Sequence, residues 1–234
     1  MAKIEFLDDV TVELVDFMGN DRRVVQAAQV SVVGKNDPEN FARDEGLINY
    51  LSGARHGSPF EHIVMTYYIE APIFVFREFM RHRIASYNEM SARYKELPPR
   101  FYIPNERRNL VQAGKSSHPD LVPGTDEQYN IMRWSQEHVA NVTWENYRDQ
   151  LDAGIALEVA RNVLPVNIMS QMYVTMNARS LMNFFSLRVD SDEAVYPSKP
   201  QKEIEMVALK MEKIFAEKYP LVHNAFLKTG RVSP

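Results

Sequence analysis

The chain has 234 residues, 45% of them hydrophobic, which is enough to bury one sizeable core, and we expect a single domain over residues 1–234. Its 27 lysines and arginines are outnumbered by 31 acidic residues, which argues against a protein held on nucleic acid or on a membrane by bulk positive charge. The absence of cysteine excludes disulfides, zinc–thiolate sites, iron–sulfur clusters and a thiol nucleophile.

The N-terminal part of the chain predicts one strand followed by two helices. Residues 10–18 alternate in polarity, as a half-buried strand does, and the turn-forming run Gly19-Asn20-Asp21 follows them. A helix is expected from about residue 22 to residue 33. The run Asn36-Asp37-Pro38-Glu39 puts a capping side chain before a proline in a first helical turn, so a second helix is predicted from there to about Ser52.

The middle of the chain predicts a strand, a helix and then irregular structure. Residues 62–71 are rich in β-branched and aromatic side chains, which favours a strand, and Pro72 can open a helix that ends near His82. Proline is too frequent around residues 98–104 for regular structure. Residues 113–125 are expected to form an exposed loop.

The C-terminal part of the chain is predicted to be mainly helical. Residues 126–151 repeat apolar side chains at helical spacing, so we expect the longest helix there, with its apolar stripe and its tryptophans packed in the core. A helix at 155–163 stops before a proline, and residues 168–175 predict a strand whose Met and Tyr side chains face the interior. Helices at 179–187 and 201–218 complete the chain.

The order of these elements favours an α+β fold, because the glycine-rich turns of a dinucleotide-binding βαβ unit are missing. Neither G-x-G-x-x-G nor a P-loop occurs, so side chains must hold any nucleotide. Residues 1–5 lack the apolar core of a signal peptide, and no apolar run approaches the ~20 residues of a membrane helix. We therefore expect a soluble, cytoplasmic protein without a membrane partner.

The segment Arg77–Arg93 concentrates groups that bind anions. It holds four arginines, one histidine, two serines, an asparagine and two glutamates among apolar residues. A guanidinium is always charged and presents a planar fork to two phosphate oxygens at once, while serine and asparagine add directional hydrogen bonds. If the helix continues to Arg83, Arg77 and Arg81 share one of its faces.

A solvated charged face is the ordinary explanation for such a run of charges. Two observations favour a site instead. The basic residues outnumber the acidic ones in a net acidic chain, and they alternate with apolar residues that must be partly buried. Buried arginines need anionic partners, and Glu78 and Glu89 are too few to serve all four.

The pattern R-H-R-x-x-S-x-N-x-x-S-x-R resembles the signature of the flavin-dependent thymidylate synthases, the ThyX family. The seven matching positions are Arg81, His82, Arg83, Ser86, Asn88, Ser91 and Arg93. The resemblance extends over most of the chain, through residues 58–62, 71–75, 160–161, 164–165, 177–184 and 187–188.

The resemblance implies a fold with a central, mainly antiparallel sheet flanked by helices, and a homotetramer whose active sites form where subunits meet. It implies an enzyme that binds FAD and converts dUMP to dTMP, with methylene-tetrahydrofolate as the carbon donor and NADPH as the reductant. The absence of cysteine agrees with this chemistry, because the better-known thymidylate synthases attack the uracil ring with a thiolate.

The resemblance also implies roles for individual residues. The implied FAD contacts are His56, Ser58, Arg81, His82, Arg83, Glu89, Asn177, Arg179 and Asn183. The implied dUMP contacts are Glu78, Arg81, Glu89, Ser91, Ala92, Arg93, Arg161 and Arg188. Arg188 is the implied catalytic residue, since it corresponds to the arginine thought to assist ionisation of the uracil ring at N3.

The chain departs from the family pattern at two places. Glu78 stands where family members usually carry glutamine, and its carboxylate cannot donate a hydrogen bond and would repel a nearby phosphate. A longer segment, residues 190–200, follows Arg188, and we expect it to bear on how that arginine is held.

Two other interpretations of the histidines and serines agree less well with the sequence. His56, His62 and His82 lack the spacing of a metal site, so we expect no metal. Neither Ser86 nor Ser91 lies in a G-x-S-x-G turn, so hydrogen bonding to a ligand is expected rather than nucleophilic attack.

The alternative function, from a different class of protein, is a non-catalytic module that binds nucleotides or RNA through the arginines and nearby aromatic residues. The acidic net charge argues against a nucleic-acid partner.

Overall fold

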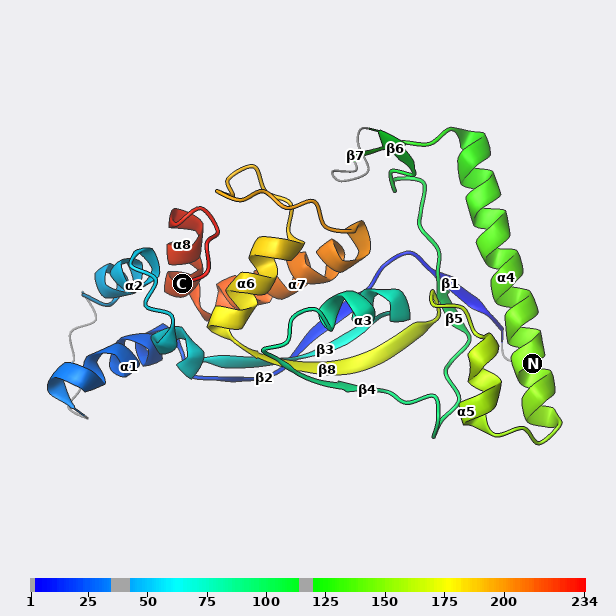
Figure 1. Cartoon of the computed structure of the whole chain (residues 1–234), viewed down its shortest axis with the longest axis horizontal. Helices are drawn as coiled ribbons and strands as arrows, with labels where there is room; N and C mark the ends of the chain where they lie inside the picture. Colours follow the sequence, from blue (N-terminus) through cyan, green and yellow to red (C-terminus); the bar gives the residue numbers. More distant parts are fainter. Residues whose placement is uncertain (1–2, 35–42, 114–119) are drawn as a thin grey trace. The chain divides into compact units, whose positions relative to one another are not determined.

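A computed structural model describes residues 3–34, 43–113 and 120–234 of the chain (Figure 1). Its strands are β1 (Glu5–Leu7), β2 (Thr11–Met18), β3 (Val64–Pro72), β4 (Ser86–Glu89), β5 (Arg100–Tyr102), β6 (Val111–Ala113), β7 (Asp120–Val122) and β8 (Met169–Asn177). Its α-helices are α1 (Asp21–Val33), α2 (Asp44–Gly53), α3 (Ile73–Phe79), α4 (Asp126–Asp152), α5 (Leu157–Ala160), α6 (Ala178–Arg188), α7 (Lys202–Lys218) and α8 (Pro220–Lys228). Two 3₁₀ turns are η2 (Ser58–His62) and η3 (Arg161–Val163).

The principal sheet is antiparallel and has the strand order β2-β3-β8-β4, with helices beside it. The predicted α+β class with an antiparallel sheet and flanking helices is therefore confirmed. Two smaller ladders accompany it, a parallel pair of β1 with β5 and an antiparallel pair of β6 with β7. Every helix among the described residues is too short or too polar to span a bilayer.

The chain divides into two compact units. The first unit comprises the described residues of Met1–Thr11, Glu70–Arg81 and Glu89–Met172, and the second those of Val12–Ile69, His82–Asn88 and Tyr173–Pro234. Strands β2, β3, β4 and β8 each contribute residues to both units. The expectation of one domain over the whole chain remains a prediction.

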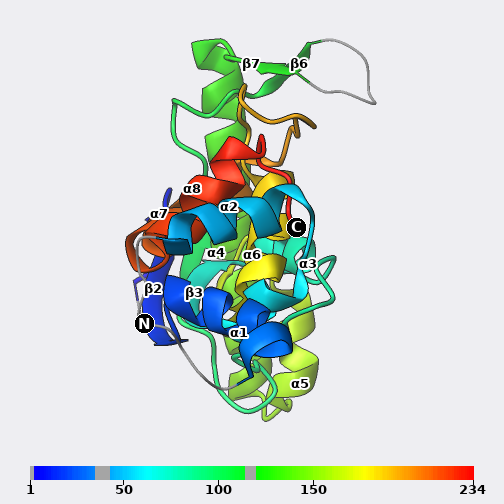
Figure 2. The ribbon, with the colours of Figure 1, turned by 90° about the vertical axis from the view of Figure 1, so that its left-hand side faces the viewer.

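Aromatic side chains form the core of the second unit. The rings of Phe184, Phe185, Phe215 and Tyr219 contact one another in succession, edge to face, and all four are fully buried. The hydroxyl of Tyr67 in β3 donates to the carbonyl oxygen of Met211 in α7. Helix α7 therefore packs against β3, and α6 and α8 lie beside α7, as Figures 1 and 2 show.

The core of the first unit lies under one face of α4. Its buried members are Ala92, Leu97, Phe101, Ala140, Trp144, Tyr147, Ala160 and Ile168. The helix begins with a reciprocal capping box, in which the Thr125 side chain accepts from the main chain of Gln128 and the Gln128 side chain bonds back to Thr125.

Several predicted elements agree with the structure. The strand at 10–18 and the helices at 22–33, 126–151, 179–187 and 201–218 correspond to β2, α1, α4, α6 and α7. The strands predicted at 62–71 and 168–175 are β3 and β8, each displaced by two residues or fewer. The second predicted helix ends as expected, at Gly53, but its predicted start at 36–39 lies outside the described residues.

The helix opened by Pro72 ends earlier than predicted. It stops at Phe79, with Met80 as its C-cap, so Arg77 and Arg81 do not share a helical face. The hydroxyl of Tyr87 donates to the carbonyl oxygen of His82, and the chain goes on into β4. A tertiary bond and sheet pairing therefore replace the helical bonds that local propensity favoured.

Two segments predicted as irregular contain strands. Strand β5, Arg100–Tyr102, follows two prolines and still pairs with β1. Proline lacks an N–H but keeps its carbonyl group, and the carbonyl oxygen of Pro99 accepts from the N–H of Glu5. Residues 111–113 and 120–122 form a hairpin at the edges of the loop expected at 113–125. The helix predicted at 155–163 is divided into α5 and the turn η3.

The prediction that the apolar stripe and both tryptophans of α4 are core residues is wrong for its N-terminal half. Trp144 is buried, but Trp134 is 68% exposed and Ile131 is 58% exposed. At 100° per residue, Ile131, Trp134 and Val142 lie on the face opposite the buried residues of α4. In β8 the methionines are buried as predicted, while Tyr173 is half exposed.

Candidate active site

The residues implied by the resemblance are divided between the two units. The first unit holds Glu78, Arg81, Glu89, Ser91, Ala92, Arg93 and Arg161. The second unit holds His56, Ser58, His82, Arg83, Asn177, Arg179, Asn183 and Arg188. Each set has its own local geometry.

A pocket of about 590 Å³ lies within the first unit. Four of the implied dUMP contacts line it, namely Glu89, Ser91, Ala92 and Arg161. Arg77, Asn162 and Ser170 also line it and were not among the implied contacts. The lining thus combines two guanidinium groups, a carboxyl, an amide and hydroxyls with apolar side chains. This composition suits a ligand that has both an anionic group and a flat apolar face.

Glu89 is held at one wall of this pocket. It ends β4, and the next residue, Met90, donates its N–H to the carbonyl oxygen of Gln171 in β8. The hydroxyl of Ser170 donates to Glu89 Oε1 at 3.0 Å. Although part of Glu89 stays exposed, burial raises its pKa above the usual value, against the opposing effects of the Ser170 bond and of Arg161. The carboxyl is therefore easier to protonate than an ordinary surface glutamate.

Three implied dUMP contacts of the first unit are not part of this lining, as far as the described residues show. Glu78 and Arg81 lie at and just after the end of α3. Arg93 Nε donates to Glu158 Oε2 at 2.9 Å, with both side chains about half exposed. A surface pair of this kind contributes little to stability, so Arg93 can exchange Glu158 for a ligand at small cost.

In the second unit, Arg188 lies against His82. Arg188 ends α6, and its Nε donates to His82 Nε2 at 3.1 Å. The His82 ring packs edge to face on Phe184, one turn earlier in the same helix, with centroids 4.8 Å apart. His82 is only 7% exposed. Burial, aided by the charge of Arg188, lowers the pKa of His82 to about 4, so the ring is neutral at pH 7.

A second cluster in this unit is centred on Arg179. Its guanidinium donates to the main-chain oxygen of Pro234 at 2.8 Å and to Glu61 Oε1 at 2.7 Å. A methyl group on Gly57 would lie 2.5 Å from Arg179 Nε and 2.9 Å from the main-chain oxygen of Pro234, so any side chain there would force these groups to move. Gly57 lies between the implied flavin contacts His56 and Ser58, so the main chain that carries them passes close to Arg179.

The remaining implied flavin contacts are exposed or serve as caps. Asn177 is the N-cap of α6, and its side chain accepts from the N–H of Ser180 at 2.9 Å. Asn183 lies on an exposed position of the same helix, and Arg83 is exposed in the turn before β4. Among the described residues, no group of three histidine, aspartate or glutamate side chains is arranged to hold a metal ion.

Comparison with known proteins identifies the relatives of the chain. Residues 13–221 match the Thy1 family, described as thymidylate synthase complementing protein. The flavin-dependent thymidylate synthase of Streptomyces coelicolor is 51% identical over 240 residues, which cover 99% of this chain and 96% of that protein. The enzyme of the same name from Tropheryma whipplei strain TW08/27 is 50% identical over 232 residues, covering 98% of this chain and 97% of that protein. The chain belongs to the Thy1 family.

Solved structures agree with this assignment. The UMP/dUMP methylase PolB from Streptomyces cacaoi, bound with 5-Br UMP, superposes with a TM-score of 0.93. It is 46% identical in sequence, and the match covers 99% of this chain and 100% of that one. A structure of PolB with 5-Br dUMP matches equally well, at 47% identity.

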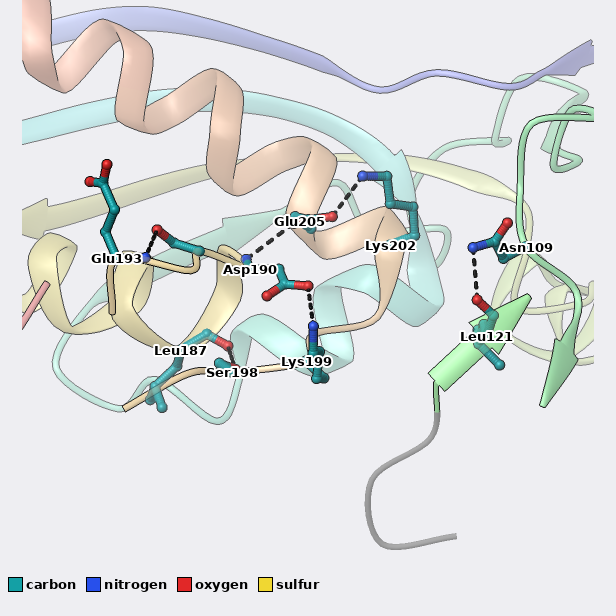
Figure 3. A network of polar contacts seen from close by, with 10 residues as sticks. Asn109, Leu121, Leu187, Asp190, Glu193, Ser198, Lys199, Lys202 and Glu205 are labelled. Atoms are coloured by element: carbon teal, nitrogen blue, oxygen red, sulfur yellow. Dashed lines mark hydrogen bonds and ion pairs between the residues drawn. The ribbon is translucent and has the colours of Figure 1, made fainter. Parts of the chain in front are cut away.

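The segment after Arg188, residues 190–200, is tied back to its surroundings (Figure 3). The hydroxyl of Ser198 donates to the carbonyl oxygen of Leu187 at 2.7 Å, and Lys199 Nζ pairs with Asp190 Oδ2 at 2.8 Å. The N–H of Asp190 donates to Glu205 in α7. The longer loop thus caps the C-terminal end of α6, next to the arginine that the resemblance identifies as catalytic.

Two features of the candidate site were not found by reading the sequence. Arg77 was noted only as part of the charged segment, and its place in the pocket depends on where α3 ends. Ser170 lies in a strand of alternating apolar residues, and its bond to Glu89 joins residues 81 positions apart. Ser170 is buried in β8, but its burial is not visible in the sequence, so no sequence signal indicated this contact.

Proposed function

We propose that the chain catalyses the methylation of dUMP to dTMP, with methylene-tetrahydrofolate as the carbon donor and FAD reduced by NADPH. The observation that carries this proposal is the pocket of the first unit, whose lining includes Glu89, Ser91 and Arg161. The flavin-dependent thymidylate synthases that are about half identical to the chain support the reaction, and PolB with 5-Br dUMP supports the nucleotide.

Arginine and serine side chains hold the nucleotide in this proposal. Arg161 and Arg77 face the same pocket and supply permanent positive charge for the phosphate of dUMP. The hydroxyl of Ser91 adds a directional hydrogen bond. Glu89 is a poor phosphate partner while it is ionised, but its raised pKa makes the carboxyl a competent hydrogen-bond donor to a neighbouring ligand atom in its protonated form.

Arg188 acts on the uracil ring in this proposal. Loss of the N3 proton leaves negative charge on the ring, and a guanidinium placed beforehand stabilises that charge without having to reorganise. Arg188 cannot serve as the base, because arginine stays protonated in proteins. Its part is therefore electrostatic.

The donor set of the second unit fits a flavin dinucleotide. Arg83 is exposed, Arg179 is partly exposed, and Asn183 offers an amide on the surface of α6, so the set supplies charge and hydrogen bonds for a diphosphate. When bound, the flavin supplies the electrons for reduction of the transferred carbon. The protein binds, orients and polarises, which agrees with the absence of a thiol nucleophile.

We also propose that the chain forms a homotetramer whose subunits together supply the active sites. The exposed apolar stripe of α4, formed by Ile131, Trp134 and Val142, supports this proposal because monomeric proteins seldom leave such a surface in water.

The colour of the purified protein separates this enzyme from a non-catalytic nucleotide-binding module. The proposed enzyme purifies with a yellow chromophore, and anaerobic addition of NADPH bleaches the flavin absorbance. A colourless protein that takes up no FAD on incubation would refute the proposal. NADH in place of NADPH, and UMP in place of dUMP, test the choice of reductant and of nucleotide.

A further inference from the structure

We propose that His82 is a positioning residue, which holds the guanidinium of Arg188 in place by accepting a hydrogen bond from its Nε at Nε2. The inference rests on the proposed function of Arg188, but it assigns His82 a role other than the flavin contact that the family resemblance implies. The observation behind it is the distance of 3.1 Å between the two nitrogens.

The chemistry of the two side chains fixes the direction of this bond. An arginine Nε can only donate, so His82 Nε2 must carry the lone pair. The neutral ring therefore has its proton on Nδ1. Burial and the neighbouring charge of Arg188 keep the ring neutral at pH 7, in agreement with this arrangement.

The surroundings of His82 hold its ring in one place. Its edge-to-face partner, Phe184, lies four residues before Arg188, and positions i and i+4 share one face of a helix. Helix α6 thus supplies both the packing surface for the ring and the guanidinium that the ring binds. On the other side, the hydroxyl of Tyr87 donates to the main-chain oxygen of His82 at 2.7 Å.

This arrangement matters because an arginine side chain has many rotamers. A stabilising charge is effective only when it is already in place as charge develops on the ligand. The bond that Arg188 donates to His82 uses Nε, and its acceptor is a neutral ring that carries no negative charge. His82 thereby restricts Arg188 without neutralising its charge.

Two amides provide a matched test. In His82→Gln the amide oxygen takes the place of Nε2, whereas in His82→Asn the shorter side chain reaches only the place of Nδ1. We expect His82→Asn to have a kcat for dTMP formation about tenfold or more below that of His82→Gln, the loss typical of one charge-assisted hydrogen bond. Flavin content and dUMP KM should be equal in the two variants. In an Arg188→Ala background the difference in kcat should vanish.

Four results would overturn the proposal, three from kcat and flavin content and one from crystal structures. Equal kcat values for the two variants would show that Nε2 has no positioning role. A difference that persists without Arg188 would show that His82 acts elsewhere, and loss of flavin in both variants would make it a flavin contact. Crystal structures of the variants decide the matter without turnover, so they remain decisive if the parent forms no dTMP and the proposed function fails. Arg188 should keep its place in the Gln variant and leave it in the Asn variant, and an unmoved guanidinium in both contradicts the proposal.

Discussion

At the scale of residues, His82 and Arg188 show how burial and a neighbouring charge together set the protonation state of a histidine. Both are basic by type, and they lie in hydrogen-bond contact. Burial, aided by the permanent charge of Arg188, lowers the pKa of His82, so the histidine stays neutral. A side chain that would titrate near pH 6.5 in water becomes a constant hydrogen-bond acceptor over the physiological range.

This shift predicts how stability depends on pH. The folded pKa of His82 is about 4 and the unfolded value is 6.5, so between these limits the unfolded chain binds more protons. Stability contributed by His82 is therefore present above pH 6.5 and is lost as the pH falls towards 4. Between pH 7 and pH 5 we expect a loss of about 2 kcal/mol in the free energy of unfolding, measured by urea titration.

The His82→Gln variant is the control for that measurement, because glutamine does not titrate. Glu89, whose raised pKa acts in the opposite direction, is present in both proteins and cancels in the comparison. The same dependence on pH in the variant and in the parent would show that His82 is not its source.

Arg188 itself is tested by replacement with alanine. Since its proposed role is to stabilise charge on uracil, Arg188→Ala should bind flavin normally and form dTMP at least ~100-fold more slowly, as when a preplaced donor is removed from an active site. Flavin absorbance and dTMP formation under saturating dUMP are the measurements. Arg133→Ala, at an exposed position of α4, serves as the control, because it removes a surface ion pair with Glu137. Turnover unchanged from the parent would remove Arg188 from the mechanism.

At the scale of elements, the loop after α6 is tied to the end of the helix that carries Arg188. Ser198 caps the carbonyl oxygen of Leu187, one residue before Arg188. Ser198→Ala should loosen this helix end and lower kcat about twofold to tenfold, because one neutral hydrogen bond contributes ~0.5–1.5 kcal/mol. Flavin binding should not change.

Ser191→Ala is the matched control, since Ser191 lies in the same loop and its hydroxyl accepts from the main chain of Glu193 rather than capping α6. Equal kcat values for the two serine variants would mean that the loop does not influence Arg188 through this cap.

The elements that could be predicted are those with local causes. Helix α4 has a long periodic pattern and a capping box, and Asn20 caps α1 just after Gly19, whose φ is 81°. Strands β1 and β5 have three residues each and exist because they pair with each other across nearly a hundred residues, which no local window reveals. Helix α8 was missed, although Pro220 opens it as Pro72 was expected to open α3.

The candidate site could likewise be predicted only in part. The motif Arg81–Arg93 and its chemistry could be recognised in the sequence, and four of the implied dUMP contacts do line one pocket. The contacts that arrange them could not be predicted, because Ser170 with Glu89 and His82 with Arg188 join distant segments. Periodicity also predicted the apolar stripe of α4. It could not show which residues of the helix face the core and which are exposed.

At the scale of the whole molecule, the exposed stripe of α4 predicts assembly. Trp134→Glu puts a charge in the middle of this stripe and should dissociate the proposed tetramer, since burying an unpaired carboxylate is costly. Light scattering should give four times the chain mass of 27.1 kDa for the parent and a smaller mass for the variant. Tyr196→Glu, at another highly exposed aromatic residue, should leave the mass unchanged. A parent that is monomeric, or a variant that stays tetrameric, contradicts this assignment.

The central claim is that the chain methylates dUMP with electrons from a reduced flavin. The direct measurement is an anaerobic reaction of the FAD-loaded protein with dUMP, methylene-tetrahydrofolate and NADPH, with the nucleotide product identified by mass. The account predicts dTMP in multiple turnovers, and none when either FAD or methylene-tetrahydrofolate is left out. A flavin-loaded, NADPH-reducible protein that leaves dUMP unchanged would contradict it.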